Sequence, residues 1–174
     1  QNLYTKINMN FEKQSGIKKF LIYQTLILGK KILKKEPLDL RQKLMNFLCE
    51  ILVRKKIRAQ FGGNLQAFVS GGGALDQNIG EFLNAVGLPT LQGYGLTEAS
   101  PVVSCNLPDL IKVETVGPAF RTNKVKIADD GEILIKGENV MLGYWNNAEE
   151  TKKVLKDGWL YTGDIGHFEK NYLK

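Results

Sequence analysis

The chain has 174 residues, 43% of them apolar, and a formal net charge of +6. This length suits one ordinary globular domain and excludes two large ones. No run approaches the roughly 18 apolar residues that a membrane-spanning helix needs, and no signal-peptide pattern is present, so we expect a cytoplasmic protein. Cys49 and Cys105 lie far apart without metal-ligand spacing, so we expect buried thiols and neither a disulfide nor a zinc site.

The charge is unevenly distributed along the chain. Residues 1–60 carry 14 Lys and Arg against 4 Asp and Glu, whereas residues 61–174 carry 10 against 14. A basic half of this kind attracts anionic partners, such as a phosphorylated ligand, a membrane surface or nucleic acid. The alternative is a solvated face of lysine-rich helices, which is the commoner meaning of a charge run.

Residues 1–60 form a basic helical segment in which two amphipathic helices are predicted. In the first, from Ile17 to Ile32, apolar residues keep to one side of a 3.6-residue repeat. Pro37 separates it from the second helix, for which Asp39 is the candidate N-cap. The predicted buried stripe of the second helix is Leu40, Leu44, Phe47, Leu48 and Ile51.

Residues 61–114 read as an α/β segment. A short buried strand is predicted over Leu65–Ser70, followed by a glycine loop and a helix capped by Asp76 and ended by Gly87. A second strand is expected over Leu88–Gln92. Strand, loop, helix and strand in about 30 residues form a parallel α/β unit, whose ligands bind beyond the carboxyl ends of the strands.

Residues 115–174 are predicted to be rich in β-structure. Two alternating runs, Lys124–Ala128 and Glu132–Lys136, flank the turn signal Asp130-Gly131, which predicts a hairpin. One more short helix is expected over Glu149–Lys156.

The block Gln92–Glu98 carries the strongest chemical signal because it follows a strand end. Its glycines let the backbone approach a ligand closely, the ring of Tyr94 can stack on a purine, and the Thr97 hydroxyl can bond a phosphate oxygen. Glu98 offers hard oxygen ligands to magnesium. The alternative for each residue alone is structural: a core aromatic for Tyr94 and a helix start for Thr97 and Glu98.

Four blocks in order resemble the adenylate-forming (AMP-binding) superfamily: Gln92–Glu98, Gly131–Gly137, Gly143-Tyr144-Trp145 and Gly158–Asp164. The Ser70–Leu75 loop and the basic helical segment before it resemble the long-chain fatty acyl-CoA synthetases. This resemblance implies an α/β fold that is part of the large domain, with a parallel sheet and helices followed by a hairpin or barrel section. The family loop usually reads Ser-Gly-Gly-Ala-Pro-Leu, so Gly73 and Ala74 depart from it.

The resemblance also implies residue roles. Tyr94 would stack on adenine, Thr97 would contact the α-phosphate as a catalytic residue, and Glu98 would be catalytic by holding Mg²⁺. Asp164 would accept the ribose hydroxyls, for which the alternative is a turn residue. The remaining pocket residues would line the adenine and acyl end, with ATP or AMP, fatty acid and CoA as ligands: Gly72, Gly73, Gln92, Gly93 and Gly95.

An upstream phosphate loop and a downstream lysine-bearing domain, which the family carries, are absent from the sequence. We therefore expect a fragment that is inactive alone, or one half of a split enzyme with a complementary fragment as partner. A non-catalytic adenine-nucleotide-binding remnant is the alternative. The basic half would suit a peripheral membrane contact with a lipid substrate nearby.

Two other functions fit the motifs less well. A serine hydrolase would use Ser70, His167 and Asp164, but Phe68 stands where its Gly-x-Ser-x-Gly elbow needs glycine. Nucleic-acid binding by the basic helices lacks interleaved aromatic residues and a known module, so we expect none.

Overall fold

The computed structural model describes residues 2–174, which fall into two compact units. The first unit runs to Val69 and continues over Leu75–Thr90, and the second contains Ser70–Ala74 and Leu91–Lys174. Helices dominate the first unit and strands the second, so the predicted α/β class is confirmed.

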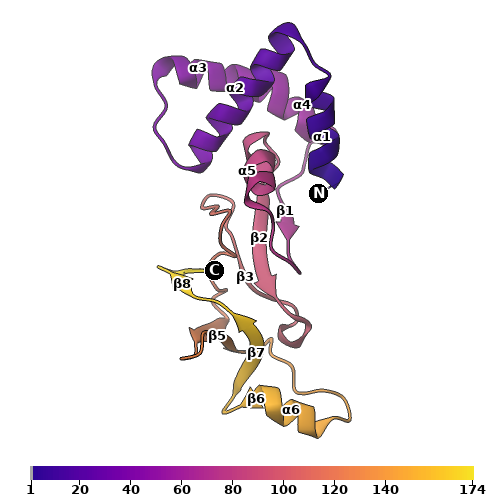
Figure 1. The fold of residues 1–174 in the computed structure, drawn as a ribbon, viewed down its shortest axis with the longest axis vertical. Helices are drawn as coiled ribbons and strands as arrows, with labels where there is room; N and C mark the ends of the chain where they lie inside the picture. The colour runs from indigo at the N-terminus through magenta and orange to yellow at the C-terminus, as the bar shows by residue number, and fades with distance from the viewer. Residues whose placement is uncertain (1) are drawn as a thin grey trace. The chain divides into compact units, whose positions relative to one another are not determined.

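The first unit is built from packed helices (Figure 1). They are α1 (Asn2–Glu12), α2 (Gly16–Leu33), α3 (Leu40–Cys49), the π-helical turn η1 (Glu50–Arg54), α4 (Lys55–Ala59) and α5 (Gln77–Ala85). The two predicted helices of residues 1–60 are thus confirmed, whereas α1 was not predicted.

The predicted helix ends are confirmed by their hydrogen bonds. Asp39 accepts from the backbone N–H of Gln42 at 2.8 Å, and the Gln42 side chain accepts from the Asp39 N–H at 3.3 Å, which is a capping box. Asp76 accepts from the N–H of Ile79 at 3.0 Å. Gly87 ends the α5 region with φ of +83°, a conformation that favours glycine.

The predicted buried face of α3 is wrong, and the predicted face of α2 is only partly buried. Leu40 is 84% exposed and Leu44 65% exposed, and the other members of the predicted stripe, Phe47, Leu48 and Ile51, are also exposed. The side that is buried carries Cys49, Val53, Arg54 and Ile57. Periodicity indicates a helix with an apolar side, but the neighbouring helices decide which side they cover.

Close contact between α2 and α5 fixes the buried side of α2. A Cβ at Gly29 would lie 2.5 Å from the Cα of Ala85, so only glycine fits there. On this side Thr25, Leu28 and Gly29 are buried, whereas Ile17, predicted to be covered, is 79% exposed. The buried core of the unit consists of Ile7, Val53, Ile57, Phe82, Leu83, Val86 and Leu88.

Three strands form one sheet in the order β1-β2-β3: β1 (Phe68–Ser70), β2 (Thr90–Gly95) and β3 (Val102–Cys105). The prediction that β1 is buried is wrong, since Val69 is 65% exposed. β1 lies at the edge of the sheet, where one side of the strand remains uncovered.

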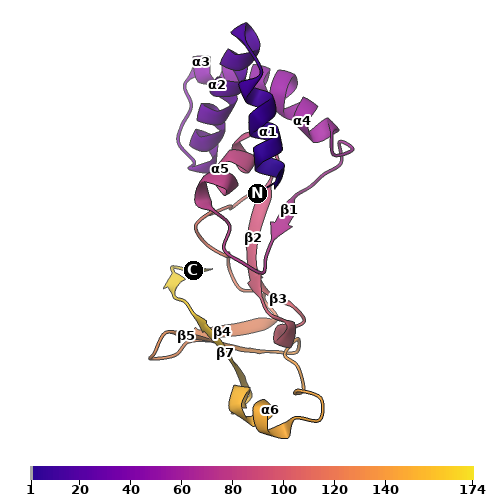
Figure 2. The same ribbon diagram turned by 45° about the vertical axis from the view of Figure 1, so that its right-hand side comes forward.

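The second unit contains an open four-stranded sheet with the order β4-β5-β7-β6 (Figure 2). Its strands are β4 (Asn123–Ile127), β5 (Glu132–Gly137), β7 (Trp159–Ile165) and β6 (Leu155–Lys156), all paired antiparallel. The predicted hairpin is confirmed as β4 and β5. A closed barrel is not formed, because no pairing joins β4 to β6 within residues 2–174.

Short elements complete the second unit: the 3₁₀ turn η2 (Thr97–Ala99), α6 (Ala148–Val154), β8 (Phe168–Glu169) and β9 (Tyr172–Leu173). The helix expected over Glu149–Lys156 therefore ends two residues earlier, where β6 begins. Cys49 and Cys105 are free and buried, as expected. Across the described part of the chain, no helix combines the length and hydropathy needed to cross a bilayer.

Candidate functional site

The glycine loop after β1 lies against β2 within the second unit. A Cβ at Gly71 would be 3.7 Å from the carbonyl oxygen of Gly93. Gly72 has φ of +78°, which a residue with a side chain rarely adopts. The loop therefore brings bare backbone up to the end of a strand, which is the place where α/β proteins bind ligands.

A pocket of about 470 Å³ opens between this loop and β2. Its volume lies within the range of about 300 to 1,000 Å³ that is typical of small-molecule sites. Seven of the predicted site residues line it: Gly72, Gly73, Gln92, Gly93, Tyr94, Gly95 and Asp164. The other lining residues, which the sequence did not suggest, are Ala74, Glu114, Val116 and Lys174.

Tyr94 and Asp164 meet in this pocket although 70 positions separate them. The phenolic hydroxyl of Tyr94 donates a hydrogen bond of 2.6 Å to Oδ2 of Asp164. Burial raises the pKa of Tyr94, and the hydrogen bond to the carboxylate raises it further. The phenol thus remains a neutral donor, and Asp164 faces the ring that the sequence suggested for purine stacking.

The backbone around Asp164 is held by a turn of hydrogen bonds at the end of β7. The Thr162 hydroxyl donates to the carbonyl of Ile133 at 2.8 Å and accepts from the Asp164 N–H at 3.1 Å. Glu132 accepts from the N–H of Gly163 at 2.7 Å. These contacts fix the backbone that leads into Asp164 before any ligand is present.

β2 ends in a tight turn that carries the next predicted residues away from the pocket. The antiparallel register between β2 and β3 shifts between Tyr94 and Gly95. A Cβ at Gly95 would lie 1.8 Å from the carbonyl oxygen of Pro101, so glycine is required there. Gly95 is followed closely by η2, on which Thr97 and Glu98 lie.

Thr97 and Glu98 do not line the 470 Å³ pocket. Glu98 instead accepts a 2.8 Å hydrogen bond at Oε1 from the hydroxyl of Tyr144, and its carbonyl accepts from the N–H of Met141 at 2.8 Å. The hydrogen bond to Glu98 raises the pKa of Tyr144, with a smaller effect of burial. Thr97 is exposed.

The Glu98 carboxylate suits a magnesium ion that is shared with a phosphorylated ligand. Mg²⁺ keeps several waters and is commonly bound by one or two carboxylates together with substrate phosphates. Only one oxygen of Glu98 is engaged, by a neutral donor, so the other can face an ion. No cluster of three or more His, Cys, Asp or Glu side chains suited to a metal occurs in residues 2–174.

Asn106 supports the pocket from behind and was not predicted. It is 2% exposed, and its amide nitrogen donates to the carbonyls of Thr115 at 2.7 Å and Gln92 at 3.2 Å. Its carbonyl oxygen accepts from the N–H of Lys112 at 2.9 Å. A single asparagine outside any motif gives no sequence signal for such a role, whereas Tyr144 lies within a block that the resemblance had singled out.

The residues of a serine-hydrolase triad are not joined. Among the residues that the structure describes, no hydrogen bond links Ser70, His167 and Asp164, and Asp164 is engaged by Tyr94. The backbone of His167 pairs with Lys174 in both directions at 2.9 Å. His167 thus extends the β8–β9 pairing by one residue.

The fold and the pocket together define a mixed α/β segment, in which a glycine loop, an aromatic residue and a carboxylate surround one cavity. Residues 28–145 match the family of AMP-binding enzymes. The chain belongs to this family.

Its relatives by sequence include long-chain fatty acid ligases. A long-chain-fatty-acid–CoA ligase of Mycobacterium tuberculosis is 42% identical over 69% of this chain and 20% of its own length. That of Salmonella typhimurium is 34% identical over 73% of this chain and 25% of its own length. Fatty acyl-CoA synthetase A of Dictyostelium discoideum is 32% identical over 98% of this chain and 27% of its own length. The chain therefore spans about a fifth to a quarter of these relatives.

Solved structures give the same classification. Apo MatB from Rhodopseudomonas palustris matches 62% of this chain with 24% of its own, at 32% identity and a TM-score of 0.57. An anthranilate CoA ligase in complex with anthranoyl-AMP matches 60% of this chain with 23% of its own, at 26% identity and a TM-score of 0.56. The predicted recognition of an adenylate-forming segment is thus confirmed.

Proposed function

We propose that this chain contributes the adenine and ribose part of the active site of an ATP-dependent long-chain fatty acid–CoA ligase. The observation that carries the proposal is the 2.6 Å hydrogen bond between Tyr94 and Asp164, made in a pocket walled by the glycine loop. A purine on the Tyr94 ring would place its ribose beside Asp164. A carboxylate is a strong acceptor for two neighbouring hydroxyl groups.

The reaction that we propose has two steps. In the first, an oxygen of the fatty acid carboxylate bonds to the α-phosphorus of ATP, and the bond from that phosphorus to the β-phosphate oxygen breaks to release pyrophosphate. In the second, the CoA thiol releases its proton to solvent, its sulfur bonds to the acyl carbonyl carbon, and the bond from that carbon to the phosphate oxygen breaks to release AMP. Both steps develop charge near the α-phosphate, where positioned donors lower the barrier.

The chain's own residues have distinct tasks in this scheme. Tyr94 and Asp164 hold the nucleoside, and the Thr97 hydroxyl donates to an α-phosphate oxygen. The Glu98 carboxylate, oriented by Tyr144, would hold Mg²⁺, which would supply positive charge to the phosphates. The backbone of Gly72 and Gly73 approaches the adenine and acyl end without steric hindrance.

Binding of AMP tests the nucleoside part of the proposal. Calorimetric titration of the chain with AMP should give saturable binding. Asp164→Ala should weaken it by about 10- to 100-fold, because a charge-assisted hydrogen bond contributes roughly 1.5 to 3 kcal/mol. Asp129→Ala, at an exposed carboxylate outside the pocket, is the matched control and should change nothing. Equal affinities for AMP in the two variants would contradict the assignment.

We also propose that the chain alone does not make acyl-CoA. The family's phosphate loop and adenylation lysine are not among these 174 residues. The removal of one transition-state donor costs roughly 3 to 4 kcal/mol, so the loss of several such groups should lower the rate to background. The assays are pyrophosphate exchange and thioester formation with fatty acid, ATP, Mg²⁺ and CoA. Turnover above a heat-killed control would overturn the claim of inactivity.

A complementary fragment of the same enzyme is the partner that we propose for activity. β1 leaves Val69 exposed at a sheet edge, and uncovered edges favour pairing with further strands. Co-expression with the two flanking fragments of a related ligase should raise the soluble yield and restore pyrophosphate exchange. An unchanged yield and no exchange would contradict it.

We propose in addition a peripheral membrane contact through the basic half. Each Lys or Arg near an anionic surface contributes about 1 kcal/mol, so binding should fall steeply with salt. Flotation with vesicles that contain phosphatidylserine should carry the chain at low salt and leave it behind at high salt. Equal flotation with neutral vesicles would refute an electrostatic contact.

A further inference from the structure

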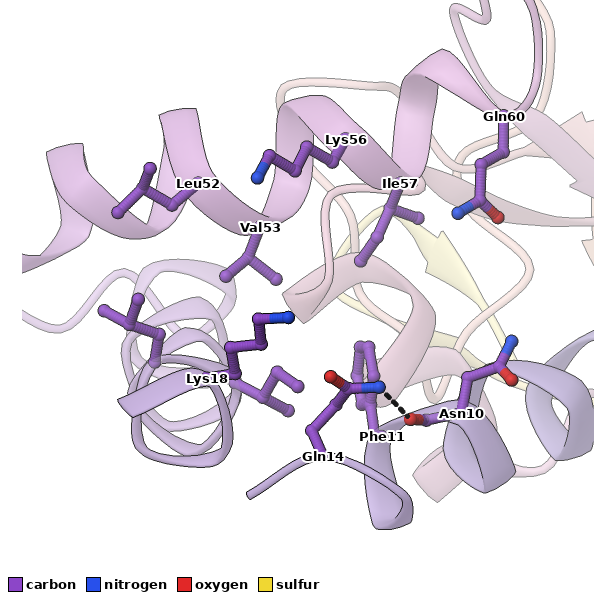
Figure 3. Close-up of a pocket in the computed structure, with 11 residues that line it drawn as sticks. Asn10, Phe11, Gln14, Lys18, Leu52, Val53, Lys56, Ile57 and Gln60 are labelled. Carbon is purple, nitrogen blue, oxygen red and sulfur yellow. Dashed lines mark hydrogen bonds between the residues drawn. The ribbon is translucent and has the colours of Figure 1, made fainter. Parts of the chain in front are cut away.

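The first unit contains a second pocket, of about 500 Å³, that has no part in the nucleotide site (Figure 3). It lies between the end of α1 and the start of α2 on one side and η1 with α4 on the other. None of its lining residues belongs to the 470 Å³ pocket. Its volume lies within the range of about 300 to 1,000 Å³ found for small-molecule sites.

The floor of this pocket is apolar. Val53 and Ile57, which are 9% and 8% exposed, belong to the core of the unit and present their sides to the pocket. Phe11, Leu21 and Ile22 continue the apolar lining, and Leu52 stands at the rim with 42% exposed. Burying this surface under an alkyl chain would contribute about 25 cal/mol for each Å² removed from water.

Two lysines stand over the apolar floor, one from each wall. Figure 3 shows Lys18 coming from the α2 wall and Lys56 from the opposite wall. Within residues 2–174 neither lysine makes an ion pair, whereas the nearby Glu50 is paired with Arg54 and Arg58. No lining residue is acidic. The pocket thus offers two free cations and no anion of its own.

The rest of the wall is neutral and polar. Gln14 closes the α1–α2 turn, where its side-chain amide donates to the carbonyl of Asn10 at 3.1 Å (Figure 3). Gln60 faces the same pocket from the end of α4. These amides can donate to an anionic group but do not neutralise it.

We propose that this pocket binds a single-chain amphiphile with an anionic head group. The head group, a carboxylate or a phosphate, lies between Lys18 and Lys56, and the alkyl chain covers Val53 and Ile57. The two lysines complement one negative group, and the apolar floor complements one chain. The site is independent of the adenylate pocket, so it does not rest on the function proposed above.

The test is calorimetric titration of the full chain with three probes of equal chain length, kept below their micelle concentrations: dodecyl phosphate, dodecanoate and dodecanol. Saturable binding of at least one anionic probe, about ten-fold tighter than dodecanol, is expected from two cation–anion contacts. The ratio between phosphate and carboxylate identifies the head group. Binding of dodecanol as tightly as of both anions would overturn the proposal.

Matched variants locate the site. The double variant Lys18→Gln with Lys56→Gln should lower the affinity for the anionic probe by about ten-fold. Lys19→Gln with Lys55→Gln, which removes the same charge from adjacent exposed positions, should leave affinity within about two-fold. Leu52→Glu, at the rim, should abolish binding while the helical circular dichroism is retained. Equal losses in the two lysine pairs, or competition by AMP, would overturn the assignment to this pocket.

Discussion

The hydroxyl of Tyr144 donates a 2.8 Å hydrogen bond to Oε1 of Glu98, joining residues 46 positions apart. Both side chains lie outside the 470 Å³ pocket, on the turn that follows β2 and on the loop before α6. Tyr144 is therefore a positioning residue, which holds the carboxylate that we propose for Mg²⁺.

Tyr144→Phe should reduce the effect of Mg²⁺ on the affinity for ATP. The ring stays and only the donor to Glu98 is lost, so affinity for AMP without Mg²⁺ should be unchanged. The gain in ATP affinity on adding Mg²⁺ should fall by about three- to ten-fold, since a hydrogen bond of this kind contributes roughly 1 kcal/mol. Calorimetry with and without Mg²⁺ measures both, and an undiminished gain would exclude the positioning role.

The raised pKa of Tyr94 predicts a loss of stability in alkali. An unfolded tyrosine titrates near pH 10, roughly its ordinary value. Above that pH the unfolded chain has released this proton while the folded chain keeps it, so the free energy of unfolding falls as pH rises. The contribution is fully present below about pH 10.

Tyr94→Phe should remove that part of the alkaline slope. Urea unfolding between pH 8 and pH 11, in about half-unit steps, gives the slope for each protein. The variant should be less steep than the parent above about pH 10. The same slope in both proteins would show that the phenol is not held neutral by burial and Asp164.

Arg54→Met should destabilise the first unit. Arg54 is 5% exposed and donates to the carbonyls of Ala85 at 2.9 Å and Thr25 at 3.1 Å, and to Asn46 Oδ1 at 2.8 Å. Ala85 ends α5, where helix carbonyls lack partners and attract positive charge. The loss should be about 2 to 4 kcal/mol of unfolding free energy by urea titration.

The exposed neighbour Lys55 provides the control for this variant. Lys55→Met should change the unfolding free energy by less than about 0.5 kcal/mol. A loss of similar size at both positions would mean that charge alone matters, and that the helix-end contacts of Arg54 do not.

Gly29→Ala should also destabilise the first unit, although alanine is the better helix former by up to about 1 kcal/mol. The new Cβ would lie 2.5 Å from Ala85 Cα, so α2 and α5 must move apart. The net loss should be about 1 to 2 kcal/mol in urea unfolding. The control is Gly73→Ala, which should leave the unfolding free energy nearly unchanged because a Cβ there meets nothing within 4 Å. A gain in stability for Gly29→Ala would refute the close contact between α2 and α5.

The sequence correctly predicted the structural features that depend on only a few neighbouring residues. The capping box of Asp39, the cap at Asp76 and the turn at Asp130-Gly131 each depend on hydrogen bonds or backbone angles within about four residues. The chemical block around Tyr94 was also found, because its residue types and spacing match a known family.

The sequence did not predict the features that depend on contacts between elements far apart in the chain. The buried side of α3 and η1 depends on the helices that cover it, and it includes Arg54, a charged residue that hydrophobic periodicity does not place in a core. Glu114 and Lys174 reach the pocket from loops and strand ends with no pattern of their own. The open form of the β4-β5-β7-β6 sheet likewise depends on strand order, which alternation does not encode.

The sequence by itself determined the caps at Asp39 and Asp76, the β4–β5 hairpin and the family, since these follow from hydrogen bonds between near neighbours and from matching motifs. Only the tertiary structure decided that Tyr94 meets Asp164, that Glu98 meets Tyr144, and that Lys18 and Lys56 share a pocket. The residues of these three pairs lie 38 to 70 positions apart in the sequence. Such contacts arise from the packing of whole elements, so no local pattern in the chain can specify them.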